Sequence, residues 1–73
     1  MLIMKIYVLV DEYPETNILI VSTDLNKVYE TADNQRLLSE EYEEDYYLKL
    51  TIWENGKCIK IHQHNDILKR NIH

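Results

Sequence analysis

The dipeptide Asn55-Gly56 constrains the fold of this chain more than any other feature. It contains the only glycine and stands between two stretches rich in aliphatic residues, at positions 48–53 and 58–61. Asn-Gly is the preferred pair of a two-residue type I′ hairpin turn, because both central positions of that turn need a positive φ. We therefore predict an antiparallel hairpin over residues 46–63, with its register set by the turn.

This register assigns the side chains of the hairpin to two faces. The predicted cross-strand pairs are Glu54 with Lys57, Trp53 with Cys58, Ile52 with Ile59, and Leu50 with Ile61. Since side chains alternate between the two faces of a strand, one face is expected to carry Leu48, Leu50, Ile52, Ile59 and Ile61. The opposite face is expected to carry Lys49, Thr51, Trp53, Cys58, Lys60 and His62.

The N-terminal third predicts a second hairpin. Residues 2–10 are β-branched, aliphatic or tyrosine, which is typical of a strand. Its two faces would carry Met4, Ile6, Val8 and Val10 on one side and Lys5, Tyr7 and Leu9 on the other. The polar segment around Pro14 predicts a loop, and residues 18–21 predict the returning strand.

A helix is predicted directly after this hairpin. Ser22, Thr23 and Asp24 are all favourable N-cap residues, and Leu25, Val28 and Ala32 follow at helical spacing. We expect about ten helical residues, with Asn34 as a candidate C-cap. Residues 35–45 then form either a second short helix or a long acidic loop.

The order of these elements predicts one α+β domain over residues 1–73, with a ββαββ core in residues 1–64. A crossover through the helix would place the third strand beside the first, which gives a small antiparallel sheet of order 2-1-3-4 with one helix on one face. Residues 65–73 are expected to be a C-terminal tail or a short helix.

Charge, apolar segments and cysteine content limit the partners and the cellular compartment that we expect for this protein. The net charge is −5, and residues 1–56 hold four bases against twelve acids, which argues against direct binding of nucleic acid. The apolar start is ten residues long and contains Lys5, whereas a membrane-spanning helix needs about 20 apolar residues. A single cysteine, Cys58, rules out an internal disulfide. We expect a cytoplasmic protein.

Two surfaces are candidates for binding a protein partner. The first is the sheet face that the helix leaves uncovered, where we expect Tyr7, Leu9, Trp53, Cys58, Lys60 and His62. An apolar and aromatic patch on such a face is typical of an interface. The second is the acidic run Glu40, Glu41, Tyr42, Glu43, Glu44 and Asp45, which could occupy a basic groove or serve only as a solvated connection.

Catalytic and metal chemistry is not expected. On a strand that rises about 3.3 Å per residue, Cys58 and His62 would lie roughly 13 Å apart, too far for a nucleophile and its base. His62 and His64 could reach one metal ion, but no suitably spaced carboxylate accompanies them. The single glycine is used in the turn, so a phosphate-binding loop is excluded. We predict no enzyme activity, no metal and no cofactor.

Three segments, KIYVLVDEY, STDLNKVYETADN and YLKLTIWENGK, carry a resemblance over about residues 4–58. Together they resemble a pattern in small uncharacterised ββαββ proteins of low-GC Gram-positive bacteria and their phages. The shared features are a tyrosine-rich first hairpin, a helix capped by Ser-Thr-Asp, and a strand that ends in Trp-Glu-Asn-Gly-Lys. These motifs are caps and a turn, so the resemblance assigns no catalytic residue.

The resemblance implies one function, and the uncovered face suggests another. By analogy with small phage proteins that block host defence, the chain would be a non-enzymatic, anti-CRISPR-like inhibitor that binds a host complex in the host cytoplasm. Alternatively, the chain would form a homo-oligomer that sequesters a small ligand, such as a signalling nucleotide, between subunits.

Overall fold

A computed structural model describes residues 4–72 and shows a four-stranded sheet with two helices. The elements are β1 (Lys5–Asp11), β2 (Asn17–Ser22), α1 (Leu25–Tyr42), β3 (Leu48–Glu54), β4 (Lys57–Gln63) and α2 (His64–Leu68). The strand order is β2-β1-β3-β4, and all neighbouring strands are antiparallel. The predicted fold class and strand order are therefore confirmed. Of the predicted first strand, Leu2 and Ile3 lie outside the described residues.

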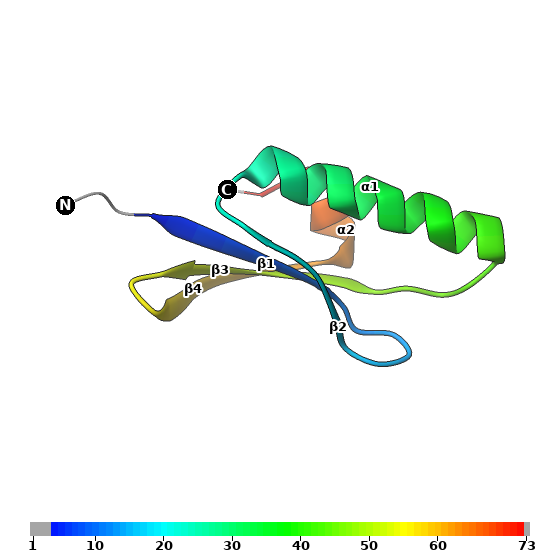
Figure 1. Cartoon of the computed structure of the whole chain (residues 1–73), viewed down its shortest axis with the longest axis horizontal. Helices are drawn as coiled ribbons and strands as arrows, with labels where there is room; N and C mark the ends of the chain where they lie inside the picture. The colour runs from blue at the N-terminus through cyan, green and yellow to red at the C-terminus, as the bar shows by residue number, and fades with distance from the viewer. Residues whose placement is uncertain (1–3, 73) are drawn as a thin grey trace.

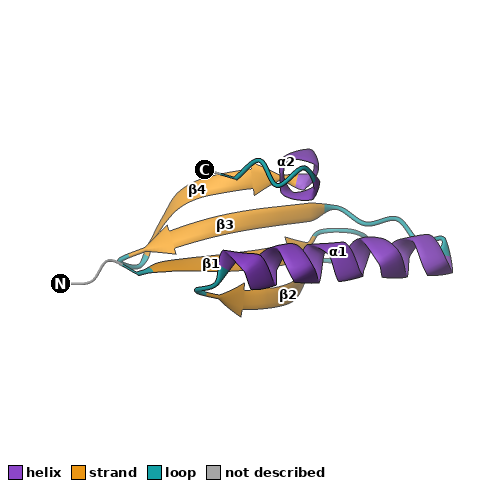
Figure 2. Ribbon diagram, turned by 90° about the horizontal axis from the view of Figure 1, so that it is seen from above, coloured by secondary structure: helices purple, strands orange, loops and turns teal. Residues whose placement is uncertain are grey.

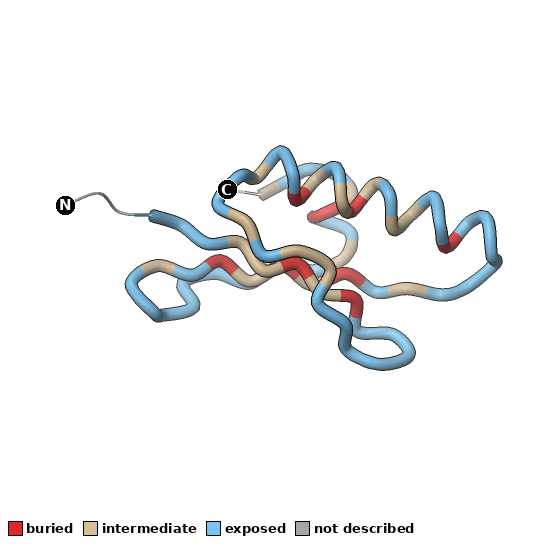
Figure 3. The backbone as a smooth tube through the Cα atoms, viewed as in Figure 1, coloured by how far each residue is buried: buried red, intermediate tan, exposed pale blue. Residues whose placement is uncertain are grey.

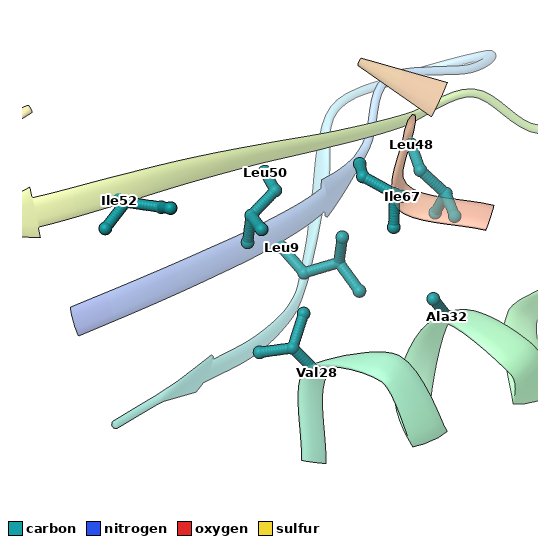
Figure 4. Packing of buried hydrophobic residues seen from close by; sticks show 7 residues of the cluster. All are labelled: Leu9, Val28, Ala32, Leu48, Leu50, Ile52 and Ile67. Atoms are coloured by element: carbon teal, nitrogen blue, oxygen red, sulfur yellow. The ribbon is translucent and has the colours of Figure 1, made fainter. Parts of the chain in front are cut away.

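Both helices lie on the same face of the sheet (Figure 1). Seen from above, α1 runs over β1 and β2, whereas α2 lies against β3 and β4 (Figure 2). The core between these layers contains Leu9, Val28, Ala32, Leu48, Leu50, Ile52 and Ile67, as Figure 4 shows. We call the face toward the helices the inner face and the opposite one the outer face.

The two faces of β1 are exchanged relative to the prediction. Tyr7 pairs with Ile52 and Leu9 pairs with Leu50, so both side chains point to the inner face. Leu9 is fully buried, and Tyr7 packs against the core. Predicting them on the uncovered face was wrong, because both alternating sets of β1 side chains are apolar and only the pairing with β3 decides which set is covered.

The predicted turn is confirmed, but the register beyond it is only partly correct. Asn55 and Gly56 have φ angles of 53° and 77°, and the pairs Glu54 with Lys57 and Trp53 with Cys58 form as predicted. The register then shifts, so that Lys60 rather than Ile59 pairs with Ile52. A β-bulge of this kind places an extra residue, here Ile59, on one strand.

The bulge moves the rest of β4 to the opposite face. Lys60 and His62 now pair with Ile52 and Leu50, so they lie on the inner side of the sheet and not on the outer face where we expected them. Ile61 pairs with Thr51 and is 53% exposed instead of buried. Figure 3 shows β4 exposed along most of its length.

The helix begins as predicted and continues further. Asp24 is the N-cap, and its Oδ1 accepts a hydrogen bond from the Asn26 backbone N–H at 2.9 Å. The helix does not end at Asn34, because buried Ser39 continues the covered stripe of Val28 and Ala32. Of the two alternatives for residues 35–45, neither holds alone: residues 35–42 extend α1, and residues 43–47 form the connection to β3.

The C-terminal segment is part of the folded structure. The helix α2 buries Ile67, which is 1% exposed, in the core. Arg70 lies beyond α2 and forms an ion pair with Asp33 of α1 over 2.8 Å. Residues 64–70 therefore complete the inner layer beside α1, and they do not cover the outer face. Neither described helix combines the length and the apolar character that crossing a membrane requires.

Candidate interaction surfaces

The outer face presents apolar side chains in rows that cross the sheet. The central row joins Val21, Val8, Thr51 and Ile61, one residue from each strand. A second row contains Ile18 and Val10, and a third contains Ile6, Trp53 and Cys58. Ile18, Val21 and Ile61 are 67%, 59% and 53% exposed. Neither α1 nor α2 packs on this side, so these apolar side chains meet solvent (Figure 1).

Trp53 lies on this face, and its indole is hydrogen-bonded to a neighbouring side chain. Its indole Nε1–H donates a hydrogen bond to Thr51 Oγ1 at 2.9 Å, two residues earlier on the same side of β3. It pairs with Ile6 on β1 and Cys58 on β4. A large side chain that is already held in one rotamer loses little conformational entropy on binding. Of the six residues predicted to bind a partner on this face, Trp53 and Cys58 are the two that the structure places there.

Charge is nearly absent from the rows of the outer face. Lys49 is the one charged residue in them, and it pairs with Val10 at the end of the face near the β1–β2 loop. Its Nζ lies 4.0 Å from Glu12 Oε2, so its charge is partly balanced. The centre of the face, around Val8 and Thr51, is therefore apolar and uncharged.

The acidic run occupies the end of α1 and the connection that follows. Glu40, Glu41 and Tyr42 belong to the last turn, Glu43 is the C-cap with a φ of 54°, and all six residues through Asp45 are exposed. The negative end of the helix dipole lies here, so these carboxylates are in an unfavourable field. No basic residue stands in the last turn, although Arg36 forms an exposed ion pair with Glu40 over 3.1 Å.

The two candidate surfaces are separate. Figure 2 shows the last turns of α1 extending past the ends of the strands, in the helix layer. The outer face lies on the other side of the sheet. Next to the acidic run, Leu37 and Leu38 are also exposed, at 53% and 48%. One partner could contact both surfaces only by wrapping around the edge of the domain.

A buried carboxylate holds the junction between the sheet and the α1–β3 connection. Asp11 is 6% exposed and accepts hydrogen bonds from the backbone N–H groups of Tyr13 and Tyr47, at 3.1 and 3.0 Å, and from Gln35 Nε2 at 3.1 Å. This role of Asp11 was not predicted from the sequence. The available signal was an acid directly at the end of an apolar strand, where a buried carboxylate needs several donors.

His64 completes the same junction. Its Nδ1 accepts the backbone N–H of Leu48 at 3.0 Å, and its ring stacks on Tyr47 with a centroid distance of 5.3 Å. Tyr46 contacts the ring edge-on at 4.7 Å. Burial raises the pKa of the Tyr46 hydroxyl above its ordinary value of 10.0, while Arg36 lowers it and Glu40 and Asp11 raise it. Tyr46 is therefore a neutral phenol at physiological pH.

Comparison of the chain with protein-family models, curated proteins and solved structures finds no match. Within residues 4–72, no pocket is found, and no three metal-ligating side chains gather at one place.

Proposed function

We propose that this chain is a non-enzymatic binding domain that docks on a protein partner through its outer face. The observation that carries the proposal is the uncovered central row of Val21, Val8, Thr51 and Ile61, which crosses all four strands. Large exposed apolar patches with polar surroundings mark interaction sites on small domains. The lack of charge at the centre of this face also fits the core of an interface, which is depleted in charged residues.

Trp53 is the proposed anchor of the interface. Tryptophan is enriched among the few residues that dominate binding energy. Trp53 is partly exposed, at 36%, and its hydrogen bond to Thr51 restricts the rotation of the indole. It can therefore fill a pocket of the partner with little loss of conformational freedom.

The charge of the domain indicates the kind of partner. The net charge is −5, and five carboxylates cluster within residues 40–45. Such a charge distribution attracts a partner with a positively charged surface and raises the rate of association. Together with the resemblance to small phage proteins, this supports a host complex that handles nucleic acid as the target. The domain would inhibit that complex in the host cytoplasm.

The test compares two aromatic truncations in a pull-down from a lysate of a low-GC Gram-positive bacterium. Trp53→Ala should weaken binding of the captured protein about 30-fold, as expected for loss of a hot-spot residue worth about 2 kcal/mol. Tyr13→Ala removes an aromatic side chain that is more exposed, at 52%, from the β1–β2 loop and should bind like the wild type. The Trp53 variant should melt within about 8 °C of the wild type.

Equal capture by wild type, Trp53→Ala and Tyr13→Ala would contradict the proposal, because the outer face would then make no contact with the bound protein. The position of Trp53 can be checked independently by its fluorescence. An indole on the open face is quenched by iodide in the free domain and protected once the partner is bound.

A further inference from the structure

The two edges of the sheet differ in how they are protected. The β4 edge carries Lys57 and Lys60, and α2 follows it directly and packs against it. Charged residues, lysine above all, on an edge strand discourage pairing with another chain. The β2 edge, Asn17–Ser22, has no charged residue and no proline. The two edge strands, β2 and β4, each contain a β-bulge, so the difference in their protection comes from their side chains.

The β2 edge is open in the structure. It is the terminal strand beside β1, and among residues 4–72 no strand lies on its other side. Among the described residues, the backbone–backbone hydrogen bonds outside the helices and the strand pairings involve none of residues 18–21. Ile18 and Val21 are among the most exposed aliphatic side chains of the molecule. An uncharged apolar edge of this kind is a template for strand addition.

The sequence of β2 matches itself when reversed. Ile18 and Val21 point to the outer face, because they pair with Val10 and Val8 of β1. Ile20, paired with Leu9, and the neighbouring Leu19 are half-buried and pack toward the core. The two ends of the strand, Asn17 and Ser22, are polar. In either direction along β2, a polar residue is followed by an outer-face side chain, two side chains toward the core, another outer-face side chain and a second polar residue.

We infer that a second copy of this chain adds to the β2 edge, in antiparallel orientation, about a twofold axis between Leu19 and Ile20. This register places each of the six residues of β2 opposite a residue of the partner subunit. The β-bulge at Leu19 puts Leu19 and Ile20 on the same face, so the side chains that lie opposite each other share a face. Ile18 meets Val21 of the partner subunit on the outer face, and Leu19 meets Ile20 of the partner subunit on the inner face. A slip by one residue would place outer side chains against inner ones, so the register is well specified.

The product would be a continuous eight-stranded sheet with the helices of both copies on one side. The apolar outer faces of the two copies would then join into one surface of twice the size. Self-association therefore uses the β2 edge and leaves the Trp53 region of the outer face free for the proposed partner. The two interactions can be broken separately.

The test measures mass by light scattering across a dilution series, with a reducing agent present because Cys58 is an exposed free cysteine. The wild type should show twice the 8.8 kDa mass of the chain at high concentration. Ile18→Lys gives β2 a charged edge residue at an exposed position and should remain monomeric there. Ile61→Lys makes the same change on the other edge strand, on the same face, and should still dimerise.

Amide hydrogen exchange gives a second readout that does not depend on a substitution. Backbone amides of β2 that point away from β1 should become protected as the protein concentration rises, whereas those on the free edge of β4 should not. A wild type that stays monomeric, or Ile18→Lys that dimerises like the wild type, would overturn the inference. Trp53→Ala should dimerise normally, so loss of partner binding and loss of self-association are distinguishable.

Discussion

The inner and outer faces of the sheet are built from similar residues but have opposite environments. On the inner face, Leu9, Leu48 and Leu50 are fully buried beneath α1 and α2. On the outer face, the side chains of Ile18, Val21 and Ile61 are more than half exposed. Hydrophobicity alone therefore does not determine which face becomes the core. The two helices cover one side, and the apolar side chains of the other side remain exposed to solvent.

The largest expected effect comes from truncating the same residue type on the two faces. Ile52→Ala removes an inner-face side chain that is 3% exposed and should lower the free energy of unfolding by about 2–5 kcal/mol. Ile61→Ala removes an outer-face side chain that is 53% exposed and should change it by less than about 0.5 kcal/mol. Urea denaturation of the monomeric proteins measures both values. Equal losses would show that the two faces are not distinguished as described.

A smaller effect is expected at the buried carboxylate of the inner face. Asp11→Ala leaves the backbone N–H groups of Tyr13 and Tyr47 and the amide of Gln35 without their acceptor, which should cost about 1–3 kcal/mol. Asp11→Asn keeps one acceptor oxygen and should cost less. The control Asp45→Asn changes an exposed carboxylate and should leave the urea midpoint unchanged. If Asp11→Ala and Asp45→Asn have the same urea midpoint, the hydrogen bonds to Asp11 do not stabilise the fold.

Asp11 illustrates why the faces of β1 could not be assigned from the sequence. The sequence placed it in the polar loop around Pro14, but in the structure it pairs with Leu48 and lies in the same alternating set as Tyr7 and Leu9. In the structure three donors satisfy the Asp11 carboxylate, so it is tolerated inside. These donors come from distant segments of the chain, and no local pattern contains that information.

Other elements were predictable to the extent that their signals are local. The turn at Asn55-Gly56 and the helix start among Ser22, Thr23 and Asp24 depend on a few adjacent residues, and both are confirmed, with Asp24 as the N-cap. The bulge that displaces Lys60 and His62 has no such signal, because Ile59 is as suitable for a regular strand as for a bulge. The length of α1 was underestimated, since its last turns are acidic and mostly exposed and buried Ser39 is not an apolar residue.

The smallest effect concerns the helix layer, on the side away from the outer face. Glu41, Glu43 and Glu44 lie at the negative end of the α1 dipole, so changing all three to Gln should stabilise the domain by about 0.3–1 kcal/mol at low salt. Glu40 is kept, because it forms an ion pair with Arg36. Glu30→Gln, at an exposed position inside α1, should have no such effect. The gain should shrink at about 1 M salt, where the screening length is about 3 Å.

If the triple variant is instead less stable than the wild type, the carboxylates contribute to folding. The stability of the domain would then be enough to explain why these carboxylates lie at the end of α1. Of the two candidate surfaces, the outer face would then be the better supported site for binding a partner.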